Sequence, residues 1–227
     1  MNSSGRGEKV SVALLVCFAV KEEAAFALPL PMLNGGRESV ITGMGRRNAS
    51  TKFENILGRL SPDRVITSGF AGALNPDLNI GDVLFEEDFD AGLGDSLKAA
   101  GAKPVNFHCS ARVAVTIAEK AELWKTTQAD AVEMESSVIR NLCRQHGIPS
   151  ATVRVISDTA HEDLPLDFNA IMTANQKISI PRLAGALLKS PRTIPRLLEL
   201  QRNTRLAARR LADVLHKSMR ALRSGRA

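Results

Sequence analysis

The sequence of 227 residues contains no tyrosine, and Trp124 is its single tryptophan. Proteins that bind single-stranded nucleic acid commonly stack the bases on aromatic side chains. Aromatic residues make up only 4% of this chain, which disfavours that class of function. The many arginines near the C-terminus are not accompanied by a base-reading motif either. We therefore expect no nucleic-acid partner.

Cysteine is also scarce, because Cys17, Cys109 and Cys143 are the only three and lie far apart. Their spacing fits no metal site, and their odd number is not that of a disulfide framework. We expect reduced thiols, a cytoplasmic protein and no bound metal. No run of 18 or more apolar residues occurs, so we expect no membrane-spanning helix.

Short apolar runs rich in valine and isoleucine recur between turn residues, at 10–18, 39–42, 64–68, 82–85, 113–116 and 151–156. They lack the alternation of half-exposed strands, which indicates strands buried on both faces. Helical patterns occupy 50–60, 118–126 and 135–146, and Gly147 follows the last as a stop signal. Strands alternating with helices predict an α/β sheet covered on both faces.

The C-terminal part differs in composition from the rest. Residues 163–195 contain four prolines and predict irregular structure or short helices, whereas 196–222 have apolar residues at helical spacing. From residue 186 onward the chain carries +9, against +6 for the whole chain and therefore −3 for residues 1–185. We divide the chain into a body, 9–185, and a basic helical extension, 186–227. The extension is either a packed helix with a solvated basic face or a basic amphipathic helix for an anionic membrane surface.

Two segments that follow predicted strands are candidate binding elements. Glu23 ends the run Lys21-Glu22-Glu23 after the first strand, at the rim where α/β sheets bind ligands. A solvated charge cluster that starts a helix is the alternative interpretation. The second segment is a turn that comprises Gly43, Gly45, Arg46 and Arg47. Its backbone N–H groups and its two arginines could bind an anion. A plain tight turn explains it equally well, and it lacks the ending of a phosphate-binding Walker loop.

Two further segments carry small residues and acids. Gly69, Ala71 and Gly72 lie beside a predicted buried strand and would let a planar ligand approach the backbone. Glu133 and Glu135 flank Met134 before a helix, and Asp158 follows at the end of an apolar strand. A partly buried carboxyl group there could hold a proton at neutral pH and donate it. Each acid taken alone is also compatible with an ordinary helix start or strand-ending turn.

Taken together, these segments resemble the purine nucleoside phosphorylase/nucleosidase superfamily, in its order and about its spacings, from residue 10 to about 160. The most similar pattern is that of nucleosidases acting on methylthioadenosine and S-adenosylhomocysteine. The resemblance implies a single three-layer α/β domain with a central mixed, mostly parallel sheet, plus the basic C-terminal helix. It also implies an enzyme that breaks the N-glycosidic bond of a purine nucleoside, releasing adenine from a 5′-substituted adenosine by hydrolysis or phosphorolysis.

By the same resemblance, Asp158 donates a proton to purine N7, and Glu23 orients or deprotonates the nucleophile with the support of Arg154. Glu135 holds the ribose hydroxyls, beside Met134 and Glu133. The residues implied on the base side are Gly69, Phe70, Ala71, Gly72 and Ser157. No cofactor is implied, although phosphate is a candidate co-substrate, and a homo-oligomer is expected.

The sequence departs from this pattern at Phe70, which replaces a hydroxyl residue that helps to hold water or phosphate. This departure leaves open the alternative that the protein is a nucleoside sensor of the same fold that has lost its catalytic activity. The aromatic residue that stacks on the purine in this family is not clearly present in the sequence. Residues 113–116 are candidates to line that side of the base-binding site instead. A second resemblance, over 118–123, 163–165 and the final helix, is to the hopanoid-associated phosphorylases. It implies a lipid-linked adenosyl substrate and peripheral membrane contact.

Overall fold

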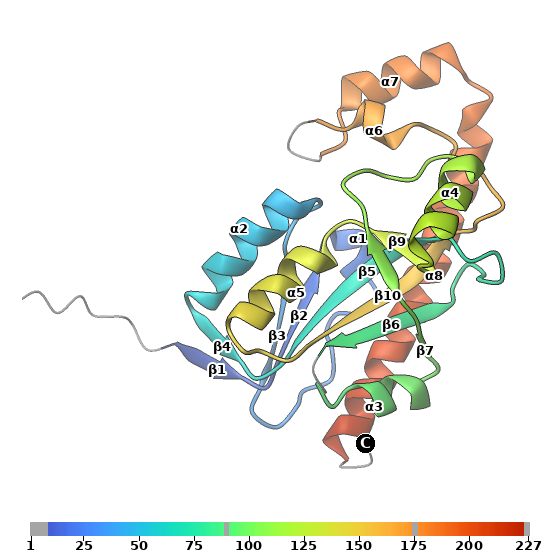
Figure 1. Cartoon of the computed structure of the whole chain (residues 1–227). Coiled ribbons are helices and arrows are strands. Elements are labelled where there is room, and N and C mark those ends of the chain that lie inside the picture. Colours follow the sequence, from blue (N-terminus) through green and yellow to red (C-terminus); the bar gives the residue numbers. More distant parts are fainter. Residues whose placement is uncertain (1–8, 89–90, 174–176, 225–227) are drawn as a thin grey trace, which may run out of the picture.

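The computed structural model describes residues 9–88, 91–173 and 177–224. A central sheet lies between two layers of helices (Figure 1), and most of its strand pairs are parallel. The predicted α/β fold with a mixed, mostly parallel sheet and a C-terminal helix is confirmed. In its main path the order of the strands is β3-β2-β5-β10-β6-β7.

The middle of the sheet consists of two nine-residue strands, β5 (Val65–Ala73) and β10 (Ser150–Asp158), which pair in parallel along their length. Nearly all their residues are buried, as the apolar runs without alternation indicated. On one side lie β2 (Leu14–Phe18) and β3 (Arg37–Ile41), both parallel to β5. On the other side, β6 (Val83–Asp88) runs antiparallel to β10, and β7 (Lys103–Pro104) completes the path.

Strand β5 changes its partner part-way along. Its first half pairs with β2, whereas Gly72 and Ala73 pair antiparallel with β9 (Ala131–Glu133), which in turn pairs with β8 (Phe107–Cys109). The sheet therefore opens at the carboxyl end of β2, between β2 and β9. Crevices at such switch points, beyond the carboxyl ends of parallel strands, are where open α/β sheets bind ligands.

Helices α2 (Arg46–Leu57) and α5 (Ser136–Gln145) cover one face of the sheet (Figure 1), where Phe53 and Ile139 pack in one apolar cluster with β2. Helix α5 ends at Gln145, and Gly147, the predicted stop signal, follows it with a φ of +64°. The Ile148 N–H donates back to the Cys143 carbonyl at 2.8 Å, which is the hydrogen bond of a glycine-ended helix.

The opposite face is covered by α8 (Thr193–Arg223), with α1 (Lys21–Ala24) and α3 (Gly94–Ala99) beside it. Leu211, Leu215 and Met219 of α8 are buried in the same cluster as β2 and β10. The predicted short helices before it are α6 (Phe168–Ile171) and α7 (Ile180–Lys189). The predicted boundary between residues 185 and 186 falls inside α7, and residues 225–227 of the extension lie outside the described residues.

The structure corrects three local predictions. Residues 113–116 form a loop rather than a strand, and Thr116 caps α4 (Ile117–Thr127) by accepting a hydrogen bond from the Glu119 N–H at 3.1 Å. The β-branched residues of this loop misled the prediction, because they favour strands only when neighbours pair with them. The opening run divides into β1 (Val10–Val12) and β2. β1 pairs with β4 (Leu60–Pro62), whose first residue was predicted to end a helix. Among the described residues, no helix combines the length and apolarity needed to cross a bilayer.

Candidate active site

A cavity of about 200 Å³ lies at the carboxyl ends of β2, β5 and β10, beside β9. It brings together nine of the predicted site residues: Glu23, Phe70, Ala71, Gly72, Glu133, Met134, Glu135, Ser157 and Asp158. Val113 and Ala114 also line it, as expected for the wall that lacks an aromatic residue. Met44, Arg112 and Leu164 also line the cavity, although none of them was predicted as a site residue.

Glu23 is buried at the start of α1, directly after β2. Its Oε2 accepts hydrogen bonds from the N–H groups of Ala19 at 2.7 Å and Val20 at 3.1 Å, and its Oε1 accepts one from Phe70 at 3.0 Å. Burial raises the pKa of Glu23, against the opposing effects of the Arg154 charge and these backbone donors. Glu23 is therefore not a solvated surface acid but a carboxyl group aimed from β2 onto the middle of β5.

Two glycines of β5 leave room for two of the acids. A Cβ atom at Gly69 would lie 2.3 Å from Glu23 Oε1, and one at Gly72 would lie 2.9 Å from Asp158 Oδ2. Both distances are shorter than real Cβ contacts. Gly72 lines the cavity, whereas Gly69, which was predicted on the base side, does not. We infer that β5 needs glycine at both positions because the carboxyl groups of Glu23 and Asp158 pack directly against its backbone.

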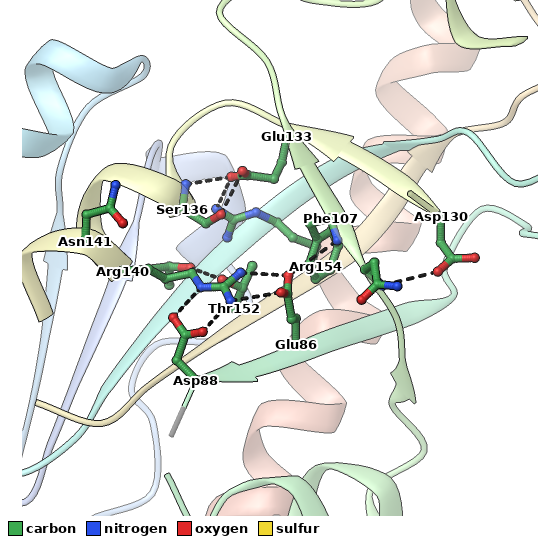
Figure 2. Close-up of polar contacts among 12 residues, drawn as sticks. Glu86, Asp88, Phe107, Asp130, Glu133, Ser136, Arg140, Asn141, Thr152 and Arg154 are labelled. Carbon is green, nitrogen blue, oxygen red and sulfur yellow. Dashed lines mark hydrogen bonds and ion pairs between the residues drawn. The ribbon is translucent and has the colours of Figure 1, made fainter. Parts of the chain in front are cut away.

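Arg154 is buried on β10 and is not among the residues that line the cavity, and its ion-pair partner is Glu133 (Figure 2). Its Nη2 donates to Glu133 Oε2 at 2.8 Å. Glu133 also accepts from the Ser136 N–H at 2.8 Å and from Ser136 Oγ at 2.7 Å. Although burial alone would raise it, the charge and hydrogen bond of Arg154 lower the pKa of Glu133 to about 2. The oxygens of Glu133 are thus engaged with Arg154 and the start of α5.

Glu135 is the N-cap residue of α5, and its Oε1 accepts a hydrogen bond from the Gly45 N–H at 2.9 Å. Burial raises the pKa of Glu135 to about 7, with Glu23 adding to the rise and Arg154 opposing it. Glu135 is therefore close to half ionised at neutral pH. Glu135 lines the cavity, so its carboxylate form could accept hydrogen bonds from hydroxyl groups there.

Asp158 ends β10 and is buried, but it does not stand alone. Its Oδ2 is 2.7 Å from the Nζ atom of Lys120 on α4, and its Oδ1 accepts from Ser157 Oγ at 2.9 Å. Lys120 was not predicted as a site residue, because a lysine among the four charged residues of a helix is usually solvated. The structure therefore adds a cation to the carboxyl group that the sequence presented as a lone acid.

The predicted anion-binding turn joins the site only through its backbone. Gly43 and Gly45 have φ values of +89° and +82°, which permit the turn, and the Gly45 N–H reaches Glu135. Arg46 donates to the Cys109 carbonyl at 2.8 Å, and neither it nor Arg47 lines the cavity. Within the described part of the chain, no group of three or more His, Cys, Asp or Glu side chains could hold a metal ion.

The family model described as the phosphorylase superfamily matches residues 20–114 and 86–189 of this sequence. The chain belongs to the phosphorylase superfamily. The predicted family and the prediction of an enzyme of the nucleoside phosphorylase/nucleosidase type are thereby confirmed.

Individual relatives in this superfamily agree with that assignment. The chain is 30% identical over 171 residues to a 5′-methylthioadenosine/S-adenosylhomocysteine nucleosidase of Staphylococcus aureus, an alignment that covers 60% of this chain and 75% of the relative. The fold is similar to that of a futalosine hydrolase of Helicobacter pylori, with a TM-score of 0.65 at 18% identity over 92% of this chain and 97% of the other. It is also similar to an S-adenosylhomocysteine nucleosidase of Streptococcus pyogenes in complex with 5-methylthiotubericidin. That match has a TM-score of 0.67 at 16% identity and covers 96% of this chain and 99% of the other.

Proposed function

We propose that this protein cleaves the N-glycosidic bond of a 5′-substituted adenosine and releases adenine. Asp158 delivers the proton to purine N7, Glu135 holds the ribose hydroxyls, and Glu23 orients or deprotonates the nucleophile. Arg154 supports the site through Glu133. The observation that carries the proposal is that three carboxyl groups from distant parts of the chain, Glu23, Glu135 and Asp158, are buried and line one cavity.

This arrangement suits the chemistry of the bond. As the bond breaks, the sugar becomes oxocarbenium-like and negative charge builds on the base. A proton delivered to the base relieves the negative charge, and a carboxylate near the ribose stabilises the positive one. General acid catalysis of this kind contributes about a hundred- to ten-thousand-fold to the rate.

The charges around the cavity favour water over phosphate as the nucleophile. Four of its described lining residues are acids: Glu23, Glu133, Glu135 and Asp158. Arg112 is the only cation in the described lining, and it is paired with Glu119 at 2.7 Å. Two more cations lie nearby, but Arg154 is paired with Glu133 and Lys120 with Asp158, so the described residues around the cavity offer no unpaired cation to hold a phosphate dianion. The relative from Staphylococcus aureus is itself named as a nucleosidase.

A second hollow supports an apolar substituent on the nucleoside. It has a volume of about 480 Å³, shares Arg112, Val113 and Ala114 with the first cavity, and extends over α4 to Ala118 and Leu123. A 5′ group larger than methylthio, including the adenosyl-lipid that the hopanoid-type resemblance implies, would have apolar surface to contact there.

We further propose that a membrane-facing arm, residues 177–198, contacts the inner surface of the cytoplasmic membrane. Its exposed apolar side chains are Ile178, Ile180, Leu188, Ile194 and Leu198. The sequence from 168 to 198 contains five lysines and arginines and no acid. Exposed apolar residues interspersed with cations are typical of peripheral binding to anionic lipid. The proposed contact therefore involves the residues before the buried part of α8 and not the whole helix.

The adjoining surface of α4 supports the proposed homo-oligomer. Ile117 and Trp124 are large apolar side chains that remain exposed there, near the second hollow. A second copy of the chain covering this face would remove that apolar area from water.

The test of the main proposal is to incubate the protein with methylthioadenosine, adenosine, inosine and an adenosyl-bearing lipid, with and without phosphate, and to measure free base. We expect adenine release without phosphate, and a loss of about a hundred- to ten-thousand-fold in kcat for Asp158→Asn. The exposed Asp63→Asn is the matched control and should keep full activity. Release that requires phosphate would select phosphorolysis, equal activity of Asp158→Asn would contradict the acid assignment, and binding without cleavage would favour the sensor alternative.

A further inference from the structure

Lys120 is the one buried residue of α4, and its side chain has 0% of its surface exposed. Removing a lysine ammonium from water is costly unless it is paired and fully hydrogen-bonded. A solvated lysine on this helix would be the ordinary outcome, because the neighbouring positions 121, 122, 124 and 125 are all exposed. The burial of Lys120 therefore requires partners that compensate for lost water.

The partners are three oxygen atoms around the proposed acid. Lys120 Nζ donates to Asp158 Oδ2 at 2.7 Å, to the Thr159 carbonyl at 2.6 Å and to the Glu162 carbonyl at 3.1 Å. A lysine ammonium has three N–H donors, and all three are used.

The acceptors also belong to one compact turn. Glu162 Oε1 accepts from the Thr159 N–H at 2.9 Å and from Thr159 Oγ1 at 3.2 Å, so residues 159–162 close on themselves. Lys120 binds the carbonyl groups at both ends of this turn as well as Asp158. Asp158 is in addition packed against Gly72, where a Cβ atom would meet Oδ2 at 2.9 Å. The Oδ2 atom of Asp158 is thus in contact with a cation and packed against a glycine of β5.

From this geometry we infer that Lys120 is a positioning residue for Asp158 in the reaction proposed above. Its ammonium fixes the orientation of the carboxyl group toward the leaving base. It also ties α4 and the turn at residues 159–162 to the end of β10. This role rests on the proposed function, because Lys120 would affect the reaction only through Asp158, the proposed acid. Lys120 itself would not contact the substrate.

A double-mutant cycle tests the inference, because an effect that acts only through Asp158 disappears when Asp158 is replaced. The variants are Lys120→Gln, Asp158→Asn and the two combined, with Lys125→Gln as the control on an exposed lysine of the same helix. Adenine release from methylthioadenosine is measured on folded protein, well below the unfolding temperature of each variant. In the wild-type background we expect Lys120→Gln to lower kcat more than about tenfold while KM changes less than about threefold. In the Asp158→Asn background the same change should lower kcat less than about twofold.

The outcomes separate this inference from the proposed function. If the wild type and Asp158→Asn release adenine equally, or neither does, the proposed function fails. If Asp158→Asn is impaired but Lys120→Gln keeps the wild-type kcat, or reduces it by the same factor in both backgrounds, the role of Lys120 is overturned. If Lys120→Gln does not fold, Lys120→Arg takes its place. It keeps the cation but moves it, and we expect kcat to fall more than about tenfold with KM nearly unchanged, whereas an unchanged kcat would overturn the inference.

Discussion

At the scale of residues, the site is a set of buried carboxyl groups in contrasting surroundings. Glu133 lies against Arg154 and has a pKa lowered to about 2, whereas burial raises the pKa of Glu135, two residues later, to about 7. One acid is thereby kept ionised to hold the structure. The other can change its charge near neutral pH. Perturbed acids with contrasting surroundings are common at catalytic sites.

The raised pKa of Glu135 predicts an acidic limb in the activity. In the proposed role of Glu135, ribose hydroxyls donate hydrogen bonds to its carboxylate, so we expect substrate binding to need the ionised form. As the pH falls below about 7, Glu135 takes up a proton, and we expect kcat/KM to fall by up to about tenfold per pH unit. A pH profile of kcat/KM measures this. In Glu135→Gln the remaining activity should have no break near pH 7, and a break that persists there would assign it to another group.

The lowered pKa of Glu133 predicts a contribution to stability. A group whose folded pKa is depressed adds stability that is fully present above its ordinary pKa of 4.5 and is lost as the pH falls toward 2. Removing the charge also leaves Arg154 buried without its partner, so Glu133→Gln should cost about 3–5 kcal/mol at pH 7–8. Glu135→Gln is the matched control, because a raised pKa means that folding already favours its neutral form. Urea unfolding at pH 8 should show a large loss for Glu133→Gln alone, and equal losses would contradict this account.

At the scale of elements, β5 decides the architecture of the site. Its first half pairs with β2 and its last residues pair with β9, so the acids that follow β2, β9 and β10 meet over one strand. The small residues of β5 are what allow this approach. A bulkier strand would push Glu23 and Asp158 away from the cavity, whatever the identity of those acids.

Gly69→Ala tests this dependence. Its Cβ would lie 2.3 Å from Glu23 Oε1, so Glu23 must leave its three backbone donors. We expect adenine release to fall at least about tenfold, because a small misplacement of a catalytic group is costly. Gly185→Ala is the control: it lies inside α7 with nothing within 4 Å of the added atom. That variant should keep full activity and unfold at the same or a slightly higher temperature, and equal activity of the two variants would exclude a role for Gly69.

At the scale of the whole molecule, the two halves of the C-terminal region have different surroundings. The second half of α8 packs on the sheet through Leu211, Leu215 and Met219, so its apolar face belongs to the core. Residues 177–198 instead leave apolar side chains exposed among cations, and Leu188 is 83% exposed. The short helix α6, which precedes the arm, contacts the wall of the cavity. Asn169 on α6 exchanges hydrogen bonds with the backbone of Val113, which lines the cavity.

Sedimentation with lipid vesicles tests the arm. We expect binding to vesicles with anionic lipid at about 50 mM salt and much weaker binding at several hundred millimolar salt or to neutral vesicles, because the attraction is screened. Leu188→Asp should abolish binding, since it removes apolar contact and adds a repelled charge. Met32→Asp, at another exposed apolar position, should leave it intact. Failure of the wild type to bind anionic vesicles at low salt would remove the proposed membrane contact.

The sequence by itself determined the parts of this protein that depend on local pattern and on nearby residues. Buried strands such as β5 and β10, the end of α5 at Gly147 and the family-specific acids are all visible there, because they reflect periodicity, backbone preference or a short motif. Only the tertiary structure decided what surrounds each acid. Glu23, Glu133 and Asp158 are all acidic residues in the sequence, but their surroundings in the structure differ. Glu23 accepts hydrogen bonds from backbone N–H groups, Glu133 is paired with Arg154, and Asp158 is paired with Lys120. Glu23 also has the nearby donors Ala19 and Val20, but Phe70, Arg154 and Lys120 lie between 21 and 47 residues from the acids that they contact. Burial and charge act through space, so no local pattern could reveal these distant partners.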